Sequence, residues 1–283
     1  MSGIEQMPYN WSKTEEINVL GTKNVIQACT SAGVQGLVYT SSYNVVFGGQ
    51  EIRDGDESLP YFPLHKHVDH YSRTKSIAEQ LVLIADGKTD PRKNVPLRTV
   101  ALRLNGVFGP GETRHLPRIV KNIPYMRFQY GYNDTLVQFC TIQNVVQAHV
   151  KASEALCVKN TKIGGQAYFI SDEVPINNLE FFRILFTKMG QPFPSRKVPM
   201  WLLWLVVYLV NFVFSVVVSI NPKWAFTPPI TAAEVYKTSV THYCSSAKAR
   251  RDFGYRAENP NDITEAVDLI FQPEQREGNK KQL

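Results

Sequence analysis

Residues 36–42 read GLVYTSS, a short apolar and β-branched run that ends in three hydroxyl side chains. A run of this kind predicts a buried parallel strand whose carboxyl end emerges at the edge of a sheet. Ligands of open α/β sheets bind at the carboxyl ends of the strands. The hydroxyl of Ser42, the last residue of the run, is therefore a candidate substrate contact.

The residues on both sides of this strand predict helices. Side chains with helical spacing form one face between residues 18 and 32, and Gly33 follows as the expected stop. A polar loop over residues 48–70 precedes a second helix that begins near Tyr71. The predicted buried face of the first helix comprises Val19, Thr22, Val25, Ile26 and Cys29, and that of the second comprises Ile77, Ala78, Leu81 and Ile84.

Residues 98–111, RTVALRLNGVFGPG, predict a further buried strand that runs into a Gly-Pro loop. A strand, a helix and a second strand form a βαβ unit, and such units build doubly wound parallel sheets. We therefore expect an α/β fold of the Rossmann type. Later strands are predicted at 136–142 and 165–172 with a helix between them, and a last helix is predicted at 263–271.

The predicted elements divide the 283 residues into two parts. A dinucleotide-binding domain is expected over residues 1–113 and 136–172. A smaller carboxyl-terminal substrate lobe is expected over residues 114–135 and 173–283. The length of the chain is sufficient for one large α/β domain with such a lobe.

The composition excludes several classes of protein. Hydrophobic residues make up 43% and charged residues 20% of the chain, so neither disorder nor a fibrous repeat is expected. The formal charge of +6 is spread along the sequence, which argues against nucleic acid as a partner. The four cysteines are too sparse for a disulfide framework and lack metal-ligand spacing, so we expect a reducing compartment. HKHVDH, at 65–70, is expected to be a solvated or substrate-edge loop without a metal.

Tyr71 and Lys75 begin the second helix in the stretch YSRTK. A separation of four residues puts both side chains on one helix face. A phenol has a pKa of about 10, but a nearby ammonium stabilises the phenolate and lowers that pKa. The pair is then able to exchange a proton with an alcohol or a ketone. A third group, a hydroxyl beside the phenol, would hold the substrate oxygen, and we assign this role to Ser42.

Six stretches extend this pattern, in order, over nearly the whole chain. They are NVLGTKNVIQAC, LVYTSSYNVVFGG, YSRTKSIAEQLV, LRLNGVFGPGE, TIQNVVQAHVKASEAL and GQAYFISDE. Together they resemble the extended short-chain dehydrogenase/reductases, and among these the 3β-hydroxysteroid dehydrogenase/isomerase branch and its subfamily 42E. The resemblance implies an oxidoreductase that uses NAD or NADP and acts on the CH-OH group of a steroid or sterol-like alcohol.

The same resemblance implies roles for four residues. Tyr71 would be the catalytic acid/base, and Lys75 would bind the ribose hydroxyls of the nicotinamide nucleotide while lowering the pKa of the phenol. Ser42 would hydrogen-bond the substrate oxygen. Asn18 would support Lys75 through its backbone and a water molecule. The family often has proline beside the nicotinamide, where this chain has Leu104.

One part of the expected fold is not in the sequence. No strand is followed by a Gly-x-x-Gly-x-x-Gly turn and a helix, the arrangement that holds a pyrophosphate at the amino end of the helix. By resemblance, Met1 corresponds to a position after the fourth strand of the sheet. We expect an amino-terminally shortened chain that lacks about 70 to 80 residues, including the residue that selects NAD or NADP.

Residues 198–220 form an apolar run of 23 residues without a charge. The run is long enough to span a bilayer as a helix. A helix in the membrane surface and a buried helix of the substrate lobe also fit, because Asn211, Ser215 and Ser219 form a polar stripe. We favour attachment to a cytosol-facing membrane such as the endoplasmic reticulum, which the resemblance also implies.

Two other classes of function stay open. A chain without its dinucleotide turn would also suit a catalytically inactive product that binds a partner or a lipid. A nucleotide-sugar epimerase or reductase would share Tyr71 and Lys75, although sugar substrates do not need a long apolar segment.

Overall fold

The computed structural model describes residues 11–113, 115–131, 135–158, 162–221, 224 and 231–271. The two ends of the predicted domain division, residues 1–10 and 272–283, lie outside this part of the chain. The helices and strands, in chain order, are α1 (Trp11–Glu15), η2 (Glu16–Leu20), α2 (Gly21–Ala32), β1 (Gly36–Ser42), η3 (Tyr43–Val45), β2 (Ile52–Gly55), α3 (His70–Ile84), β3 (Arg98–Leu104), β4 (Gly106–Phe108), α4 (His115–Asn122), η4 (Ile123–Tyr125), β5 (Phe128–Gln129), β6 (Phe139–Thr141), α5 (Ile142–Cys157), β7 (Gln166–Ile170), α6 (Asn178–Phe181), α7 (Arg183–Lys188), β8 (Arg196–Lys197), α8 (Met200–Ile220), α9 (Ala232–Ser239), β9 (His242–Cys244), α10 (Ala247–Phe253) and α11 (Thr264–Phe271).

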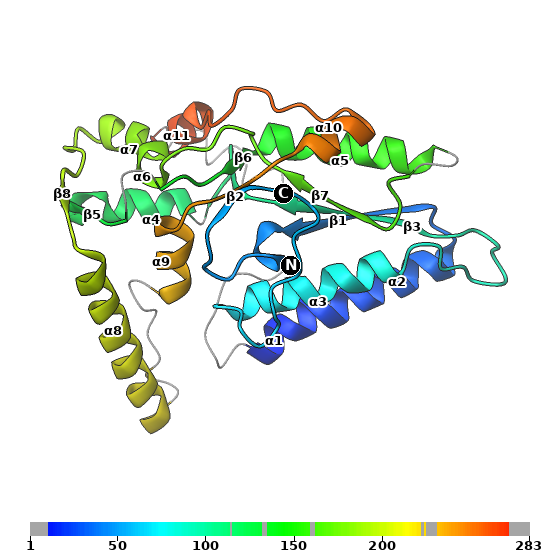
Figure 1. The fold of residues 1–283 in the computed structure, drawn as a ribbon, viewed down its shortest axis with the longest axis horizontal. Helices are drawn as coiled ribbons and strands as arrows, with labels where there is room; N and C mark the ends of the chain where they lie inside the picture. Colours follow the sequence, from blue (N-terminus) through cyan, green and yellow to red (C-terminus); the bar gives the residue numbers. More distant parts are fainter. Residues whose placement is uncertain are drawn as a thin grey trace, which may run out of the picture.

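The centre of the protein is a parallel sheet in the order β1-β3-β7 (Figure 1). Strand β1 has the bounds that the sequence predicted, and Ser42 lies opposite Leu104, so that β1 and β3 end together. The predicted helix before β1 is confirmed and extends back to Trp11 through one π-helical segment, η2. It ends at Gly33, whose φ of +73° lies in the left-handed region that favours glycine.

Helices cover both faces of the sheet, with α2 and α3 on one face and α5 and α10 on the other (Figure 1). Leu102 and Leu104 of β3 pack with α5, whereas Ala101 packs with Ala78 and Val82 of α3. Successive side chains of a strand point to opposite faces, so a strand buried on both faces needs an unbroken apolar run. The predicted doubly wound α/β fold is confirmed.

The predicted buried faces of the two helices are wrong in part. Val25 on α2 is 50% exposed and Ile84 on α3 is 71% exposed. The side of α3 that faces the sheet carries Lys75 and Glu79 together with Ala78, and all three are buried. Apolar spacing missed this side because charged residues are rarely buried unless they are paired.

A second core lies beyond the sheet, where α4, α7 and α11 pack together with β4 and β6. Its centre is a group of four aromatic rings whose centroids are 3.8 to 6.0 Å apart. These rings belong to Phe108, Phe139, Phe181 and Phe182. The two predicted parts are interleaved. Strand β2 of the predicted dinucleotide-binding domain pairs in parallel with β9 of the predicted substrate lobe, and α10 of that lobe packs against β7 of the sheet.

Helix α8 extends away from the other elements (Figure 1). It contacts α9 through the rings of Trp204 and Tyr236, whose centroids are 4.8 Å apart. Among the described residues α8 is the one helix long and apolar enough to cross a membrane, and only 11% of its most apolar window is buried. The described residues therefore leave most of α8 uncovered, which does not fit the interpretation as a buried helix of the substrate lobe.

Asp172 joins three segments after the end of β7 and is buried. Its Oδ1 accepts hydrogen bonds from the backbone NH of Thr141 at 2.9 Å and from Nδ2 of Asn144 at 2.7 Å. Its Oδ2 accepts from the backbone NH of Asn261 at 2.9 Å. This carboxylate therefore holds the start of α5 and the segment before α11 against the sheet.

Replacing Asp172 with alanine is expected to lower the free energy of unfolding by at least about 3 kcal/mol, because three buried donors lose a charged acceptor. Urea denaturation measures the loss. Asp268→Ala is the matched control, since Asp268 is partly exposed and pairs with Lys188 on the surface. Its loss is expected to stay within about 1 kcal/mol, and equal losses for the two variants would contradict the structural role of Asp172.

Candidate active site

The amino end of α3 lies at the carboxyl edge of the sheet and is fixed by a side-chain cap. Asp69 is the N-cap residue, and its Oδ1 accepts a hydrogen bond from the backbone NH of Ser72 at 2.6 Å. Its Oδ2 pairs with Nζ of Lys237, on α9, at 2.7 Å. Burial opposes the charge of Asp69, but the ammonium and the backbone donor outweigh it and hold the pKa of the carboxyl below its ordinary value.

Lys75 is buried under β1. Its Nζ donates a hydrogen bond to the hydroxyl of Tyr39 at 3.2 Å and another to the carbonyl oxygen of Thr40. It also lies 4.4 Å from the centroid of the Tyr39 ring. Burial lowers the pKa of Lys75 to about 7, and the carboxylate of Glu79 offsets part of that effect. The amine is therefore able to gain and lose a proton near neutral pH.

Tyr71 lies one turn before Lys75 on the same helix and is half-buried. Two other phenols, those of Tyr39 and Tyr43, lie close enough to Tyr71 for it to affect their pKa. Burial raises the pKa of both Tyr39 and Tyr43, and the charge on Tyr71 raises it further. These two phenols therefore stay protonated at neutral pH beside Tyr71.

Asn18 lies in η2 and is fully buried against α3. Its side-chain Nδ2 donates a hydrogen bond to Oγ1 of Thr74 at 3.1 Å. Its backbone carbonyl oxygen accepts one from Oγ1 of Thr22 at 2.6 Å. Thr74 directly precedes Lys75. The structure thus brings Asn18 to the turn of α3 that carries the lysine.

Ser42 is buried at the end of β1, where its Oγ accepts a hydrogen bond from the backbone NH of Asn44 at 3.3 Å. This contact is local to the turn after the strand. Ser42 shares the carboxyl edge of the sheet with the start of α3, as the sequence predicted from its place in the strand. Its role in binding substrate remains a prediction.

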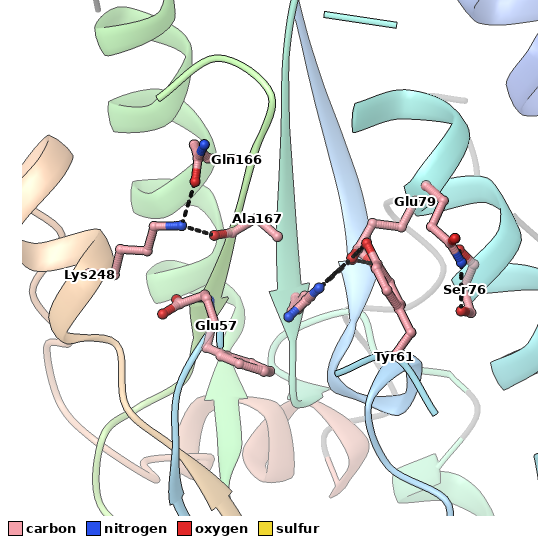
Figure 2. Close-up of polar contacts among 11 residues, drawn as sticks. Glu57, Tyr61, Ser76, Glu79, Gln166, Ala167 and Lys248 are labelled. Carbon is pink, nitrogen blue, oxygen red and sulfur yellow. Dashed lines mark hydrogen bonds and ion pairs between the residues drawn. The ribbon is translucent and has the colours of Figure 1, made fainter. Parts of the chain in front are cut away.

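The sequence did not reveal a buried polar cluster around Glu79 (Figure 2). Glu79 accepts hydrogen bonds from the hydroxyl of Tyr61 at 2.7 Å and from Nη2 of Arg103 at 2.8 Å. Oγ of Ser41 also donates to Glu79. The spacing of the sequence could have predicted that Glu79 belongs to this site. Tyr71, Lys75 and Glu79 follow one another at intervals of four residues and so share one face of α3.

Two histidines at the start of α3 and in the loop before it pack against aromatic rings. His70 stacks on Trp11 with ring centroids 5.0 Å apart, and His67 meets the edge of Phe62 at 5.3 Å. Within the described ranges, no group of three histidine, cysteine, aspartate or glutamate side chains is arranged to hold a metal ion. The polar loop thus supports the start of α3.

Comparisons with known proteins show the family of this chain. Residues 3–200 match the model of the 3-beta hydroxysteroid dehydrogenase/isomerase family. Short-chain dehydrogenase/reductase family 42E member 1 of Bos taurus is 52% identical over 271 residues, which are 95% of this chain and 67% of that protein. Sterol-4-alpha-carboxylate 3-dehydrogenase, decarboxylating, of Mus musculus is 35% identical over 253 residues, which are 88% of this chain and 67% of that protein.

A solved structure shows the same fold. It is a double mutant of DesIV, a dTDP-glucose 4,6-dehydratase from Streptomyces venezuelae, with a TM-score of 0.64 at 16% identity over 97% of this chain and 73% of that chain. The doubly wound sheet and the relatives define the class as oxidoreductases of the short-chain dehydrogenase/reductase type. The chain belongs to the 3-beta hydroxysteroid dehydrogenase/isomerase family.

Replacing Lys75 with methionine is expected to remove a pH dependence of stability. The pKa of Lys75 is about 7 in the folded protein and 10.5 ordinarily, so between these values the unfolded chain binds more protons. The free energy of unfolding of the unmodified protein therefore rises with pH, by about 1 kcal/mol per pH unit relative to Lys75→Met. Urea denaturation at pH 7, 8 and 9 measures the slope.

Lys188→Met provides the control for this experiment, because the side chain of Lys188 is 45% exposed. Its curve is expected to run parallel to that of the unmodified protein over the same pH range. A parallel curve for Lys75→Met as well would contradict the burial of the amine.

Proposed function

We propose that this protein is an NAD- or NADP-dependent oxidoreductase that acts on the CH-OH group of a steroid or sterol-like alcohol. The observation that carries the proposal is the position of Lys75, buried beneath β1 one helical turn from Tyr71, at the carboxyl edge of the sheet. Family membership gives the reaction type. Two relatives carry names of dehydrogenases, one of them a sterol-4-alpha-carboxylate 3-dehydrogenase.

In this proposal Tyr71 moves the proton. Its phenol gives a proton to a ketone oxygen or takes one from an alcohol, and the ammonium of Lys75 stabilises the phenolate. Ser42 holds the substrate oxygen beside the phenol. Asn18 acts as a positioning residue, because its hydrogen bond to Thr74 fixes the turn that carries Lys75.

Two residues that would hold the ribose of a nicotinamide nucleotide are present. Tyr71 and Lys75 are the proposed contacts of the nicotinamide ribose, and Nζ of Lys75 already donates hydrogen bonds to oxygen atoms of β1. The sequence contains no glycine-rich turn for the pyrophosphate. When bound, the nicotinamide would accept or donate the hydride.

The substrate lobe is proposed to comprise residues 114–135 and 173–283. The core that contains Phe108, Phe139, Phe181 and Phe182 joins this lobe to β4 and β6, and most of the apolar surface of α8 is uncovered by the described residues. An apolar substrate would suit such surroundings, because the hydrophobic effect favours transfer of a sterol from water to an apolar surface.

Turnover of a 3β-hydroxysteroid is the direct test, followed by the absorbance of the reduced nicotinamide. Two proteins are assayed, the chain as it stands and the same chain preceded by a strand, glycine-rich turn and helix of the dinucleotide-binding type. Tyr71→Phe is expected to lower kcat by about 100-fold or more, because the acid/base is lost while the ring is kept. Tyr125→Phe is the control, since Tyr125 is 82% exposed. Absence of turnover in both proteins would sink the proposal.

We also propose that α8 attaches the protein to a membrane. The helix has 21 residues, or about 32 Å at 1.5 Å per residue, which matches a bilayer core. Its large apolar side chains face outward, including Trp201, Leu205 and Phe212, which are 57% to 68% exposed. Hydroxyls of Ser215 and Ser219 donate to backbone carbonyls of α8, so both serines of the polar stripe are satisfied within the helix.

Flotation with phosphatidylcholine vesicles tests this attachment. The unmodified protein is expected to float, and the triple variant Leu205→Gln, Leu209→Gln, Phe212→Gln is expected to lose most of its binding. Val146→Gln with Val150→Gln is the control, because these side chains are exposed apolar residues of α5. A triple variant that still floats would contradict the role of α8.

A further inference from the structure

Asn105 carries a buried side-chain amide without hydrogen-bond partners. The residue follows β3 directly and is 5% exposed. Neither its Oδ1 nor its Nδ2 has a partner within the described structure. A buried amide without partners destabilises the folded state, because it loses the hydrogen bonds that water gives the unfolded chain.

A second buried asparagine has hydrogen-bond partners for both polar atoms of its side-chain amide. Asn144, on α5, is 1% exposed. Its Nδ2 donates to Oδ1 of Asp172 at 2.7 Å and to the carbonyl oxygen of Glu258 at 2.9 Å, and its Oδ1 accepts from the backbone NH of Glu258 at 2.9 Å. Asn144 is therefore structural, whereas the amide of Asn105 has no structural hydrogen bond.

The strand register places Asn105 at the candidate active site. Leu104 lies opposite Ser42, and the backbone NH of Asn105 bonds to the carbonyl oxygen of Ile170 at 3.4 Å, so the ladder continues through Asn105. Side chains alternate along β3, and Ala101 and Arg103 both face α3. By the same alternation Asn105 lies on the α3 face.

Distances along the two elements bring Asn105 to the level of Lys75, one helical turn from Tyr71. Arg103 pairs with Glu79, and Asn105 lies two residues further along the strand, about 6.6 Å toward its carboxyl end. Helix α3 runs back along the sheet, because it connects two parallel strands. Lys75 and Tyr71 therefore lie about 6 and 12 Å beyond Glu79 in the same direction.

Other unsatisfied polar atoms are found around this edge. Oδ1 of Asn44, two residues after Ser42, is buried without a partner, and so is Oγ of Ser72, next to Tyr71. Several groups at the ends of β1 and β3 and at the start of α3 thus retain hydrogen-bonding capacity.

We propose that Asn105 binds a second oxygen of the substrate, a hydroxyl or carbonyl on a carbon close to the one that reacts. The inference rests on the proposed function, because it concerns the same site. Ser42 is assigned to the reacting oxygen, and neighbouring strands lie about 4.8 Å apart, so the amide reaches an oxygen within one or two carbons of the first. An amide both donates and accepts, which suits a hydroxyl better than an ion.

Thermal unfolding of the ligand-free protein tests the first half of the proposal. Asn105→Leu keeps the shape of the side chain and removes the unsatisfied atoms, so the Tm is expected to rise by about 2 °C or more. Asn144→Leu is the matched control, and its Tm is expected to fall because three hydrogen bonds are lost. A fall in Tm for Asn105→Leu as large as that for Asn144→Leu would overturn the inference.

Binding of two steroids tests the second half by equilibrium dialysis. One is a 3β-hydroxysteroid, and the other carries an additional hydroxyl on the carbon next to the 3β-hydroxyl. The unmodified protein is expected to bind the dihydroxy compound at least about tenfold more tightly, and Asn105→Leu is expected to lose this preference while it still binds the simpler steroid.

The other outcomes separate this inference from the proposed function. Equal binding of the two steroids by the unmodified protein overturns the role of Asn105 and leaves the proposed function in place. Binding of neither steroid overturns both. Loss of NAD and NADP binding by Asn105→Leu, with the steroid preference retained, assigns the amide to the nicotinamide carboxamide and overturns the inference.

Discussion

The burial of Lys75 is the constraint on which the rest of the site depends. An ammonium removed from water needs new acceptors, and the carbonyl of Thr40 and the hydroxyl and ring of Tyr39 supply them. All of these groups belong to β1. Helix α3 must therefore cross that strand closely, and this contact sets the position of Tyr71 at the carboxyl edge of the sheet.

The buried pair of Glu79 and Arg103 fixes the same helix to β3 one turn further on. Replacing a buried ion pair with apolar residues often leaves a protein as stable as before, so the pair is better understood through geometry than through energy. Hydrogen bonds from Tyr61 and Ser41 to Glu79 allow one arrangement of the side chains. With the Asp69 cap and its partner Lys237, the helix is held on both sides of the turn that carries Tyr71 and Lys75.

The two cores and α8 differ in the physical surroundings that they provide. The sheet with its covering helices provides a rigid edge for polar chemistry, and the phenylalanine-rich core provides apolar surroundings beyond that edge. Helix α8 leaves most of its apolar surface uncovered by the described residues. A protein that draws a sterol-like alcohol from a membrane would need both a dry, polar site and an apolar surface in contact with lipid.

The sequence by itself determined the α/β class, the bounds of β1, the helix that begins near Tyr71 and the apolar segment, because each depends on local spacing and on runs of one kind of residue. It also placed Tyr71 and Lys75 on one face of α3. Only the tertiary structure decided that Glu79 is buried with Arg103, that Ile84 is exposed, and that the amide of Asn105 has no partner among the described residues. The reason is physical: the burial of a charged or polar group depends on partners brought from distant strands, and one segment's spacing carries no information about them.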